Sequence, residues 1–389
     1  MRIGIDNISP GLGTSRRTMG GLYHFICDLV SWLPKIAPQH EYVLFQPDWA
    51  DSLDLYDNNI VKVHYCKGVP KNRPGRVFYE QVIYPQVIHQ SKVKVFLGAC
   101  NVLPLRLCIP TVVVMHSLQY FDYPRVYRWH ELAYLRFFVP LTWRKAEVII
   151  ALSEASKQTI IEKGRCPQEK IHVVYCGLSS EMQSGKDGKN YREGLALVNQ
   201  LVQGKPYILS ASSFYWMKNL PRLIEAFARL KQERRIPHVL LMVGGETPIV
   251  TRRGLMELAA HLEVADSVIF PGVVPHALIL AFYVNAAVTA MPSLYETFGC
   301  PVLEAMSCGC PVVTSQGGTM AEIAQGCAVL VNPYQVQSIA DGIARVLEDP
   351  ELRQHLITSG LARAQDFTLE AQAQGYLAAL EKAGNESLH

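Results

Sequence analysis

The 389-residue sequence predicts an α/β protein with two doubly wound, Rossmann-like parallel-sheet domains that face each other across a cleft. Three observations lead to this prediction. The length suits two domains, since one domain usually takes roughly 100–200 residues. Short β-branched apolar runs alternate with helical patterns, which is typical of parallel sheets covered on both faces. A polar, aperiodic stretch, "SSEMQSGKDGKNYREG" (179–194), separates two such series.

The expected strands divide between the two halves of the chain. Those of the first half are "RIGID" (2–6), "YVLFQ" (42–46), "IVKVHY" (60–65), "VKVFLG" (93–98), "TVVVM" (111–115), "EVIIAL" (147–152) and "IHVVY" (171–175). Those of the second half are "YILSA" (207–211), "HVLLMV" (238–243), "SVIF" (267–270), "AVTAM" (287–291), "PVVTS" (311–315) and "AVLV" (328–331). Helical spacing aligns two apolar faces, Leu22, Phe25, Ile26, Leu29, Val30 and Leu33, and Leu220, Leu223, Ile224, Phe227 and Leu230. We expect one domain over 1–190 and another over 195–368.

Composition narrows the function classes. A formal net charge of +3 is too small to suggest nucleic-acid binding. Most of the ten cysteines lie in apolar runs, as expected in a reducing compartment, and no pair at zinc spacing accompanies Cys308 and Cys310, so we expect no metal site. The N-terminus lacks a signal-peptide core, and no apolar run nears the ~20 residues of a membrane span. We expect a cytoplasmic protein, whose surface can also contact the inner face of the membrane.

Ligands of doubly wound sheets bind beyond the carboxyl ends of the strands, so the loops that follow the strands are the expected binding sites. After the first strand, glycines lead into a helix that starts near Gly20 and Gly21, where backbone N–H groups can approach an anion. The full G-x-G-x-x-G fingerprint is absent, because Arg16 stands in place of its third glycine. An ordinary flexible loop is the alternative interpretation.

A second loop follows strand 111–115 and begins with His116. A histidine at the carboxyl end of a central strand lies where a substrate is expected. A histidine that is hydrogen-bonded within the loop is an equally good interpretation. The residues after it can line an acceptor pocket, namely Tyr120, Asp122 and Tyr123.

The loop after strand 207–211 offers groups that suit a phosphate. Ser212 and Ser213 present hydroxyls, and Lys218 lies at a helix start. A cation beside free backbone N–H groups favours a phosphate ligand. A solvated surface lysine is the alternative interpretation.

The stretch "PSLYETFGCPVLEAMSCG" (292–309) holds two carboxylates, Glu296 and Glu304. Pro301 suits the first turn of a helix, whose start then presents the N–H groups of Phe298, Gly299 and Cys300. A carboxylate can accept hydrogen bonds from two adjacent hydroxyls, so the pair suits a ligand with two sugars and phosphates between them. Taken singly, Glu296 also fits a helix-capping carboxylate and Glu304 a surface residue paired to a cation.

Together these motifs resemble glycosyltransferase family 4, whose members have the GT-B fold. The stretch 268–334 carries the resemblance most specifically, because its spaced glutamates match the family's signature pair. "YILSASSFYWMKNLPRLIEAFARL" and "IIALSEASKQTIIEKGRCPQEKIHVVYCGL" are similar to the family as well. The resemblance covers residues 145–370 clearly and 1–125 more loosely.

The resemblance implies a role for each matching residue. It implies that Glu296 holds hydroxyls of the transferred sugar and that Glu304 accepts from the ribose hydroxyls. It also implies that Lys218 neutralises the diphosphate leaving group and that His116 faces the donor sugar. The implied catalytic residues are His116, Lys218 and Glu296, and the implied donor-binding residues are Gly20, Gly21, Ser213, Lys218, Val274, Phe298, Gly299, Cys300 and Glu304.

The resemblance further implies transfer of a sugar from a nucleotide-diphosphate donor, with retention of configuration and without a metal, to a glycan, lipid-linked or small-molecule acceptor. "YETFG" together with the lysine loop looks most like GDP-mannose enzymes of polysaccharide assembly, and UDP- and dTDP-sugars stay open. The chain departs from the family pattern at three places, His116-Ser117, Ser212-Ser213 and Cys176-Gly177. A sugar-nucleotide-binding protein without catalysis and a nucleotide-sugar epimerase of the same fold are the alternatives.

Two further segments suggest contacts beyond the donor. "FTLEAQAQGYLAALEKA" (367–383) resembles the family's terminal helix, so we expect residues 369–389 to cross back to the first domain. "RVYRWHELAYLRFFVPLTWRK" (125–145) mixes basic and aromatic residues and can rest on an anionic membrane surface. An ordinary packing helix with solvated arginines is the alternative for 125–145.

Overall fold

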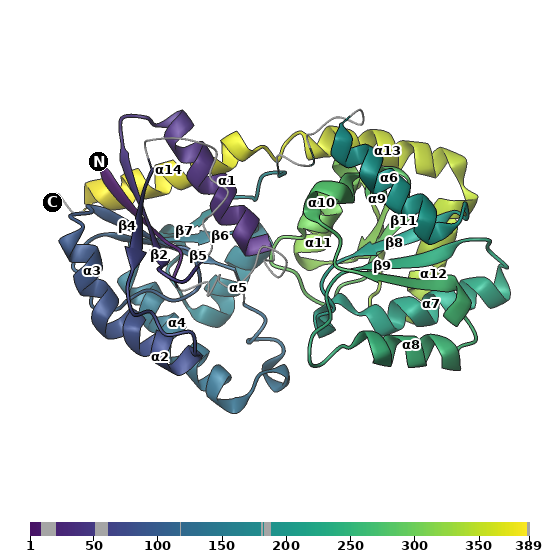
Figure 1. Ribbon diagram of the computed structural model, residues 1–389, viewed down its shortest axis with the longest axis horizontal. Coiled ribbons are helices and arrows are strands. Elements are labelled where there is room, and N and C mark those ends of the chain that lie inside the picture. Colours follow the sequence, from purple (N-terminus) through teal and green to yellow (C-terminus); the bar gives the residue numbers. More distant parts are fainter. Residues whose placement is uncertain (9–20, 51–60, 117, 180–181, 183–187, 387–389) are drawn as a thin grey trace. The chain divides into compact units, whose positions relative to one another are not determined.

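The computed structural model describes residues 1–8, 21–50, 61–116, 118–179, 182 and 188–386. The chain forms two compact units (Figure 1), of which unit 1 comprises Met1–Gly177 and Thr368–His389, and unit 2 comprises Leu178–Phe367. The sequence analysis placed the first boundary near residue 190, whereas the chain enters unit 2 at Leu178. Both units are α/β structures with parallel sheets. The expected cleft between the two units stays a prediction.

Unit 1 is built on a seven-stranded parallel sheet with the order β3-β2-β1-β4-β5-β6-β7. Its strands are β1 (Arg2–Asp6), β2 (Glu41–Pro47), β3 (Val61–Cys66), β4 (Val95–Gly98), β5 (Thr111–Met115), β6 (Val148–Ala151) and β7 (Ile171–Val173). The predicted strands 2–6 and 111–115 match β1 and β5 residue for residue. The others differ by one or two residues at their ends, because pairing with a neighbouring strand, and not the apolar run, sets where a strand begins and ends.

The helices of unit 1 cover this sheet. They are α1 (Gly21–Ile36), α2 (Arg73–Phe78), α3 (Tyr84–Gln90), α4 (Trp129–Lys145), α5 (Glu154–Gly164) and α14 (Leu369–Glu386), with the π-helical turn η1 (Tyr79–Ile83) and the 3₁₀ turns η2 (Pro124–Val126) and η3 (Gln168–Lys170). The chain runs from α2 through η1 into α3 without a break. A π-helical turn within a helical run is rare, and the sequence analysis did not predict this run.

The C-terminal helix α14 packs on unit 1, against α1 and the strands β4, β5 and β6. Tyr376 and Leu380 on α14 are fully buried, and the ring of Tyr376 lies 5.5 Å from that of Phe25 on α1. Gly375 lets the helix approach Val174, because a Cβ there would lie 2.8 Å from a Val174 methyl group. The first and last helices of the described chain therefore share one part of the core of unit 1.

Unit 2 is built on a six-stranded parallel sheet with the order β10-β9-β8-β11-β12-β13. Its strands are β8 (Tyr207–Ala211), β9 (Val239–Val243), β10 (Val268–Gly272), β11 (Val288–Met291), β12 (Val312–Ser315) and β13 (Val329–Val331). Its helices are α6 (Lys189–Val202), α7 (Leu220–Glu233), α8 (Arg252–His261), α9 (Ile279–Val284), α10 (Cys300–Ser307), α11 (Gly318–Ala324), α12 (Val336–Glu348) and α13 (Pro350–Ala364), with the 3₁₀ turns η5 (Trp216–Lys218), η6 (Ala265–Ser267) and η7 (His276–Leu278).

The core of unit 2 forms where helices bury their apolar faces on this sheet. On α7 the predicted face is buried as a whole, since every one of its five residues is at most 2% exposed. The α7 face meets strand residues such as Ile208 and Leu240 in one cluster, together with α12. The helical spacing read from the sequence therefore orients α7 correctly.

The polar stretch 179–194 was expected to be an aperiodic linker, and its second half is instead the start of helix α6. Gly194 is buried where α6 crosses the following chain, since a Cβ there would lie 2.5 Å from the carbonyl oxygen of Leu278. Val198 and Val202 are buried further along the same helix. The polar residues at the start of α6 concealed this helix, because its apolar contacts begin only at Gly194.

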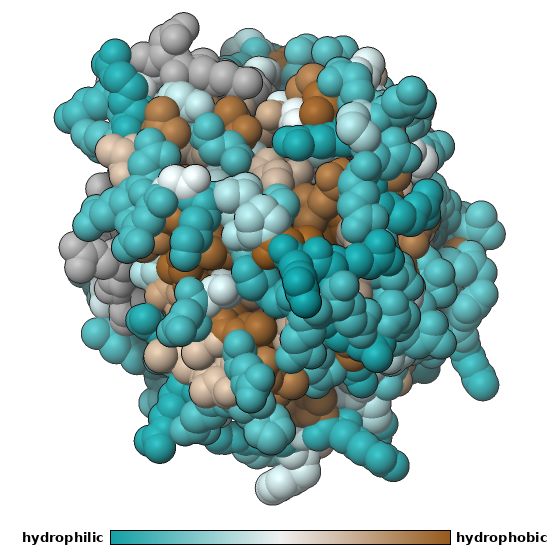
Figure 2. Space-filling model, turned by 90° about the vertical axis from the view of Figure 1, so that its right-hand side faces the viewer, coloured by the Kyte–Doolittle hydropathy of each residue, from teal (hydrophilic) through white to brown (hydrophobic). Residues whose placement is uncertain are grey.

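Hydrophilic residues dominate the face of the molecule drawn in Figure 2, and hydrophobic residues are scattered among them. This side corresponds to the right-hand edge of Figure 1, where unit 2 is drawn. Among the described residues, no helix is both long and apolar enough to cross a bilayer.

Candidate active site

Two loops of unit 2 bring together the lysine and the first glutamate that the sequence singled out. Lys218 ends η5, after β8, and Glu296 lies in the loop after β11, the neighbouring strand. The ammonium of Lys218 lies 2.5 Å from Oε1 of Glu296, and both side chains are little exposed, at 13% and 11%. The carboxyl ends of adjacent parallel strands thus join residues that are far apart in the sequence.

Further hydrogen bonds hold these two loops in register. The backbone N–H of Leu294 donates to the carbonyl of Met217 over 2.7 Å. The buried side chain of Asn219 donates to the carbonyl oxygens of Pro292 and Pro333, over 3.0 and 2.6 Å. Asn219 itself adopts a left-handed conformation with φ of 58°, which asparagine tolerates better than most residues. These hydrogen bonds fix the two loops that carry Lys218 and Glu296.

The start of helix α10 lies next to Glu296 in sequence and depends on one glycine. Gly299 precedes the helix with φ of 100°, and a Cβ there would lie 2.1 Å from the terminal methyl group of Met320. Pro301 occupies the first turn, as predicted. Phe298 is buried with its ring edge-on to Phe367 at 5.9 Å. The backbone at the helix start is therefore fixed from both sides, while Cys300 is exposed there.

Glu304 occupies the next part of α10 and has different partners. Its Oε2 accepts a hydrogen bond of 2.8 Å from the hydroxyl of Tyr283, and its Oε1 lies 3.5 Å from Nε2 of His276. The carboxylate is only 16% exposed, and the imidazole of His276, a cation when protonated, is an ion-pair partner, so pairing to a cation stays an alternative interpretation. Burial, and then the charge of Glu304, raise the pKa of Tyr283 well above its usual value, so its hydroxyl stays a donor.

The sequence analysis missed Tyr283 and His276. Tyr283 lies on α9 in an apolar run and is fully buried, so by pattern alone it is an ordinary core residue. His276 follows the turn that contains Val274, and its place beyond the carboxyl end of β10 is the signal that could have identified it. Only the fold shows that both face Glu304.

The remaining predicted residues of unit 2 also lie at the carboxyl edge of its sheet. Ser213 is exposed after β8, and Val274 is half-buried between β10 and η7. The backbone N–H of Phe214, the residue after Ser213, donates to the carbonyl of Gly245 over 2.7 Å, which joins the loops after β8 and β9. The donor contacts expected of Ser213 and Val274 stay predictions.

In unit 1, His116 follows β5 directly. Its backbone N–H donates to Oδ1 of Asn101 over 2.8 Å, and its ring meets that of Phe25 edge-on at 4.9 Å. Burial lowers the pKa of His116 to about 4, although a backbone hydrogen bond with Ala99 acts in the opposite direction. The imidazole is therefore neutral at physiological pH. Gly20 lies outside the described residues, and Gly21 is the first residue of α1.

The three expected acceptor residues differ in environment. Tyr120 is only 2% exposed and stacks on Phe121 at 4.3 Å. Asp122 forms an ion pair with Lys163, and Tyr123 is half-buried before η2. Their role in acceptor binding stays a prediction.

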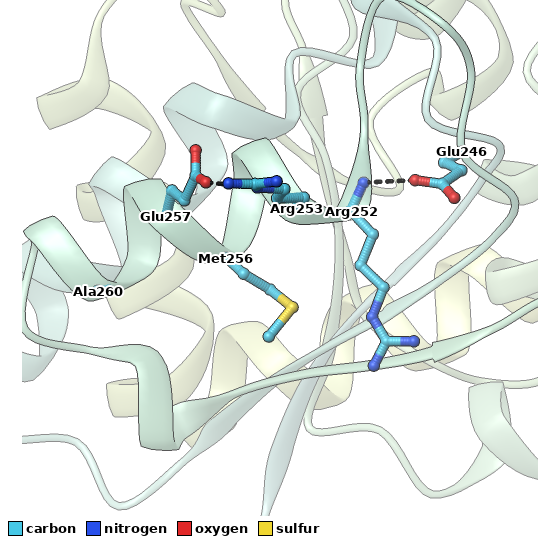
Figure 3. A pocket seen from close by; sticks show the side chains of 6 residues that line it. All are labelled: Glu246, Arg252, Arg253, Met256, Glu257 and Ala260. Carbon is cyan, nitrogen blue, oxygen red and sulfur yellow. Dashed lines mark hydrogen bonds and ion pairs between the residues drawn. The ribbon is translucent and has the colours of Figure 1, made fainter.

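A separate surface pocket of about 490 Å³ opens beside α8 in unit 2 (Figure 3). Its lining consists of Glu246, Arg252, Arg253, Met256, Glu257 and Ala260, none of which the sequence analysis had singled out. Arg253 turns towards Glu257, with Nε 2.8 Å from Oε1, and the backbone N–H of Arg252 donates to Glu246. Exposed i,i+4 pairs of this kind are common on helices, so the pocket is not the candidate site. Within the described ranges, no three His, Cys, Asp or Glu side chains are grouped as metal ligands.

Fold and site together indicate an enzyme class, and the match to family models identifies it. Residues 196–363 match the model of glycosyl transferases group 1, and residues 19–181 match that of Glycosyltransferase Family 4. The first match falls within unit 2, and the second falls almost wholly on unit 1. The chain belongs to the glycosyltransferases of GT-B fold, in family 4, as its sequence motifs suggested.

Two relatives illustrate the similarity in sequence. The chain is 27% identical over 264 residues to an MMP alpha-(1->4)-mannosyltransferase of Mycolicibacterium hassiacum, a match that covers 67% of this chain and 59% of the relative. It is 26% identical over 265 residues to the O-antigen chain mannosyltransferase B of Escherichia coli, covering 67% of each. The chain thus spans less than two thirds of the length of the first relative.

Two solved structures illustrate the similarity in fold. The sucrose-phosphate synthase of Thermosynechococcus elongatus superimposes with a TM-score of 0.79 at 20% identity, covering 99% of both chains. HepE of Anabaena, solved in complex with UDP and glucose, superimposes with a TM-score of 0.73 at 19% identity, covering 98% of this chain and 99% of that one. At such identities the likeness concerns the GT-B fold alone.

Proposed function

We propose that this protein is a retaining glycosyltransferase that transfers a sugar, mannose by preference, from a nucleotide-diphosphate donor to a glycan, lipid-linked or small-molecule acceptor without a metal ion. The main support is the pair of Lys218 and Glu296, 2.5 Å apart at the carboxyl edge of the sheet of unit 2. The pair consists of a cation and, next to it, a carboxylate that can accept hydrogen bonds from hydroxyl groups. A nucleotide sugar needs both, one for its phosphates and one for its sugar.

Lys218 serves the leaving group in this proposal. The diphosphate gains negative charge as the glycosidic bond breaks, and a cation held in place beforehand stabilises that charge in the transition state. Glu296 holds Lys218 in position before the donor arrives. The donor phosphates then compete for the ammonium, which frees the carboxylate to accept hydrogen bonds from the sugar hydroxyls. The glycine turn at Gly299 adds backbone N–H groups at the same point, with its neighbours Phe298 and Cys300.

Glu304 serves the nucleoside. Tyr283 and His276 hold its two oxygens, and the carboxylate accepts hydrogen bonds from the ribose hydroxyls. Val274, near His276, offers its backbone to the base. Ser213, with the glycines at Gly20 and Gly21, completes the contacts expected with the diphosphate.

The reaction proceeds by front-face attack, in which the departing phosphate oxygen takes the proton of the acceptor hydroxyl. Neutral His116 then contributes hydrogen bonds to the donor sugar rather than charge. Retaining glycosidases instead form a covalent intermediate on a carboxylate. In this proposal no such intermediate forms, and a glycosylated Glu296 or Asp122 trapped from a turnover mixture and found by mass spectrometry would overturn it.

The identity of the donor rests on the names of relatives. Both relatives described above are mannosyltransferases, which supports GDP-mannose. HepE was solved with UDP and glucose, so a UDP-sugar is the first alternative and a dTDP-sugar the second. The base and the sugar of the donor are therefore proposed from the names of relatives.

A thermal-shift screen of the full chain against nucleoside diphosphates and their sugars tests the proposal. A ligand that binds the folded state raises the unfolding midpoint by mass action. We expect GDP and GDP-mannose to give the largest rise, and Lys218→Ala to remove most of it. No rise with any nucleotide would contradict the proposal, and a rise without slow release of nucleoside diphosphate would identify a binding protein instead.

A further inference from the structure

Unit 1 carries an exposed apolar surface within its most basic segments. We propose that this surface binds an anionic lipid bilayer directly. We call it the lipid-facing surface, and it consists of Phe78, Val82, Ile83, Trp129 and Phe137 with the arginines among them. The inference does not depend on the donor chemistry of unit 2, because all of these residues lie in unit 1.

The apolar side chains of this surface are unusually open to solvent. Trp129 is 82% exposed, Phe137 62% and Phe78 60%. Val82 and Ile83 are exposed beside Phe78, within η1. Single exposed hydrophobic residues are ordinary, but neighbouring ones on a soluble domain mark a contact surface.

Helix α4 has a buried side from Leu135 onwards, and its exposed side includes its first residue, Trp129. Trp129, Arg136, Phe137 and Arg144 are exposed, and their spacing places them within one face of the helix. Leu135, Val139, Thr142 and Trp143 are buried on the opposite side. The aromatic residues of 125–145 are therefore not all packing residues, since Trp143 is buried while Trp129 and Phe137 face solvent.

Helix α2 is drawn next to α4 (Figure 1), and the first residue of α2 contacts α4. Nη1 of Arg73, at the start of α2, lies 2.7 Å from Oε1 of Glu131 on α4. The guanidinium of Arg73 also lies over the ring of Tyr134, 5.5 Å from its centroid. The sequence analysis had found only the α4 part of this surface.

Positive charge is concentrated in the same two segments. Residues 71–90 and 125–145 contain eight lysines and arginines against two glutamates, a net charge of +6. The whole chain has a net charge of +3, so the rest of it is negative by 3. The carboxylate of Glu131 forms an ion pair with Arg73. Burial raises the pKa of Glu80 to about 8, so Glu80 carries less than a full negative charge near neutral pH. The two glutamates therefore do not cancel the positive charge of the exposed arginines. The charge complements an anionic partner.

The mixture of residues favours a bilayer over other anionic partners. Trp and Phe settle at the interface between headgroups and acyl chains, and arginines around them meet anionic headgroups. Val82 and Ile83 suit acyl chains, whereas they offer nothing to a phosphodiester backbone. A second copy of the chain is disfavoured, because two surfaces of the same strong charge repel each other.

Vesicle flotation of the full chain tests the inference, with phosphatidylcholine vesicles compared with vesicles that also contain phosphatidylglycerol. We expect the protein to float with the anionic vesicles at low salt, and to float much less with neutral vesicles or at high salt. The double variant Trp129→Ser, Phe137→Ser should lose at least tenfold in partition. Ile249→Ser is the matched control, because Ile249 is an exposed apolar residue of unit 2 and should leave partition unchanged.

Two controls separate this inference from failure of the protein itself. The unfolding midpoints of all variants, and their shifts with the nucleotides tested above, should equal those of the parent. The inference is overturned if the parent protein stays unbound at low salt, or if the double variant floats as well as the parent. Equal retention of parent and double variant on single-stranded RNA, without flotation, would overturn it in favour of nucleic acid.

Discussion

Glu296 and Glu304 lie eight positions apart in the sequence, and the structure gives them different partners. Glu296 faces the cation of Lys218, whereas Glu304 is held by the neutral hydroxyl of Tyr283 and lies near His276. In the proposed function, the donor phosphates compete with Glu296 for Lys218, whereas the hydrogen bond from Tyr283 to Glu304 stays in place. We therefore expect the two residues to respond differently to the same donor.

Tyr283→Phe should weaken donor binding with little effect on turnover. The variant removes only the hydroxyl that donates to Glu304, and leaving a buried acceptor without its donor costs roughly 1–3 kcal/mol. We expect about a tenfold rise in the donor dissociation constant, which corresponds to ~1.4 kcal/mol, as measured by titration calorimetry. Tyr65→Phe, an exposed tyrosine of β3, is the control. Unchanged donor affinity in Tyr283→Phe would show that Tyr283 only fills space.

Glu80 makes the stability of unit 1 depend on pH. Burial, and then the nearby charge of Asp6, raise the pKa of Glu80 to about 8 from an ordinary 4.5. The folded state keeps a proton that the unfolded state has released, so stability falls as the pH rises from 4.5 through about 8. His116 acts in the opposite direction, with stability falling as the pH drops below 6.5, because its pKa is lowered to about 4.

Glu80→Gln should therefore flatten the decline in stability between about pH 6.5 and pH 9, where His116 does not titrate. The glutamine keeps the size of the side chain and cannot ionise. The parent should lose no more than a few kcal/mol over this range, since one pH unit corresponds to 1.36 kcal/mol. Urea unfolding at both ends of the range measures the difference. Parallel declines in parent and variant would rule out Glu80 as the source.

At the scale of elements, helix α10 is bounded by two glycines in the left-handed region. Gly299 has φ of 100° before the helix, and Gly309 has φ of 69° after it. A Cβ on Gly299 would meet Met320, whereas the nearest atom to a Cβ on Gly309 lies 3.6 Å away. A side chain at either position would strain the backbone, but only Gly299 lies at the candidate site.

Gly299→Ala should lower both stability and donor affinity, whereas Gly309→Ala should lower stability alone. An alanine in the left-handed region costs of order 1–2 kcal/mol. At Gly299 the added methyl group also displaces Met320 and the backbone N–H groups at the helix start. Thermal unfolding with and without nucleotide measures both effects. Equal nucleotide-induced shifts in the two variants would contradict the role of the α10 start in the site.

The elements also show where sequence patterns succeed. The predicted strands overlap every strand of the described residues. Most are apolar runs because buried parallel strands are apolar on both faces, whereas the edge strand β3 is largely exposed. Pattern failed at α6, whose first turn is polar, and at the π-helical turn η1, whose backbone geometry has no residue signature. Tyr283 was missed for a related reason, since its hydroxyl turns to Glu304 from within an apolar helix.

At the scale of the whole molecule, the chain returns from unit 2 to unit 1 at Thr368 and ends in α14. The backbone N–H of Gly177 donates to the side chain of Gln372, so the point where the chain leaves unit 1 is tied to the helix on which it returns. The expectation that residues 369–389 cross back to the first domain rested on the resemblance of 367–383 to a family helix rather than on periodicity.

Deletion of residues 370–389 should destabilise unit 1. It removes Tyr376 and Leu380, which are fully buried, and each such side chain stabilises by about 1.5–3 kcal/mol. We expect a lower unfolding midpoint for unit 1, seen by thermal unfolding, while Gln374→Ala, an exposed change on the same helix, leaves it unaltered. A truncated chain that unfolds like the parent would show that α14 is dispensable.

The central claim is that Glu296 and Glu304 hold different parts of one nucleotide sugar. The most direct test measures donor affinity and single-turnover rate in Glu296→Ala and Glu304→Ala side by side. We expect Glu304→Ala mainly to weaken donor binding, and Glu296→Ala mainly to slow transfer once donor is bound. Donor affinity and transfer rate equal to those of the parent in both variants would contradict the claim.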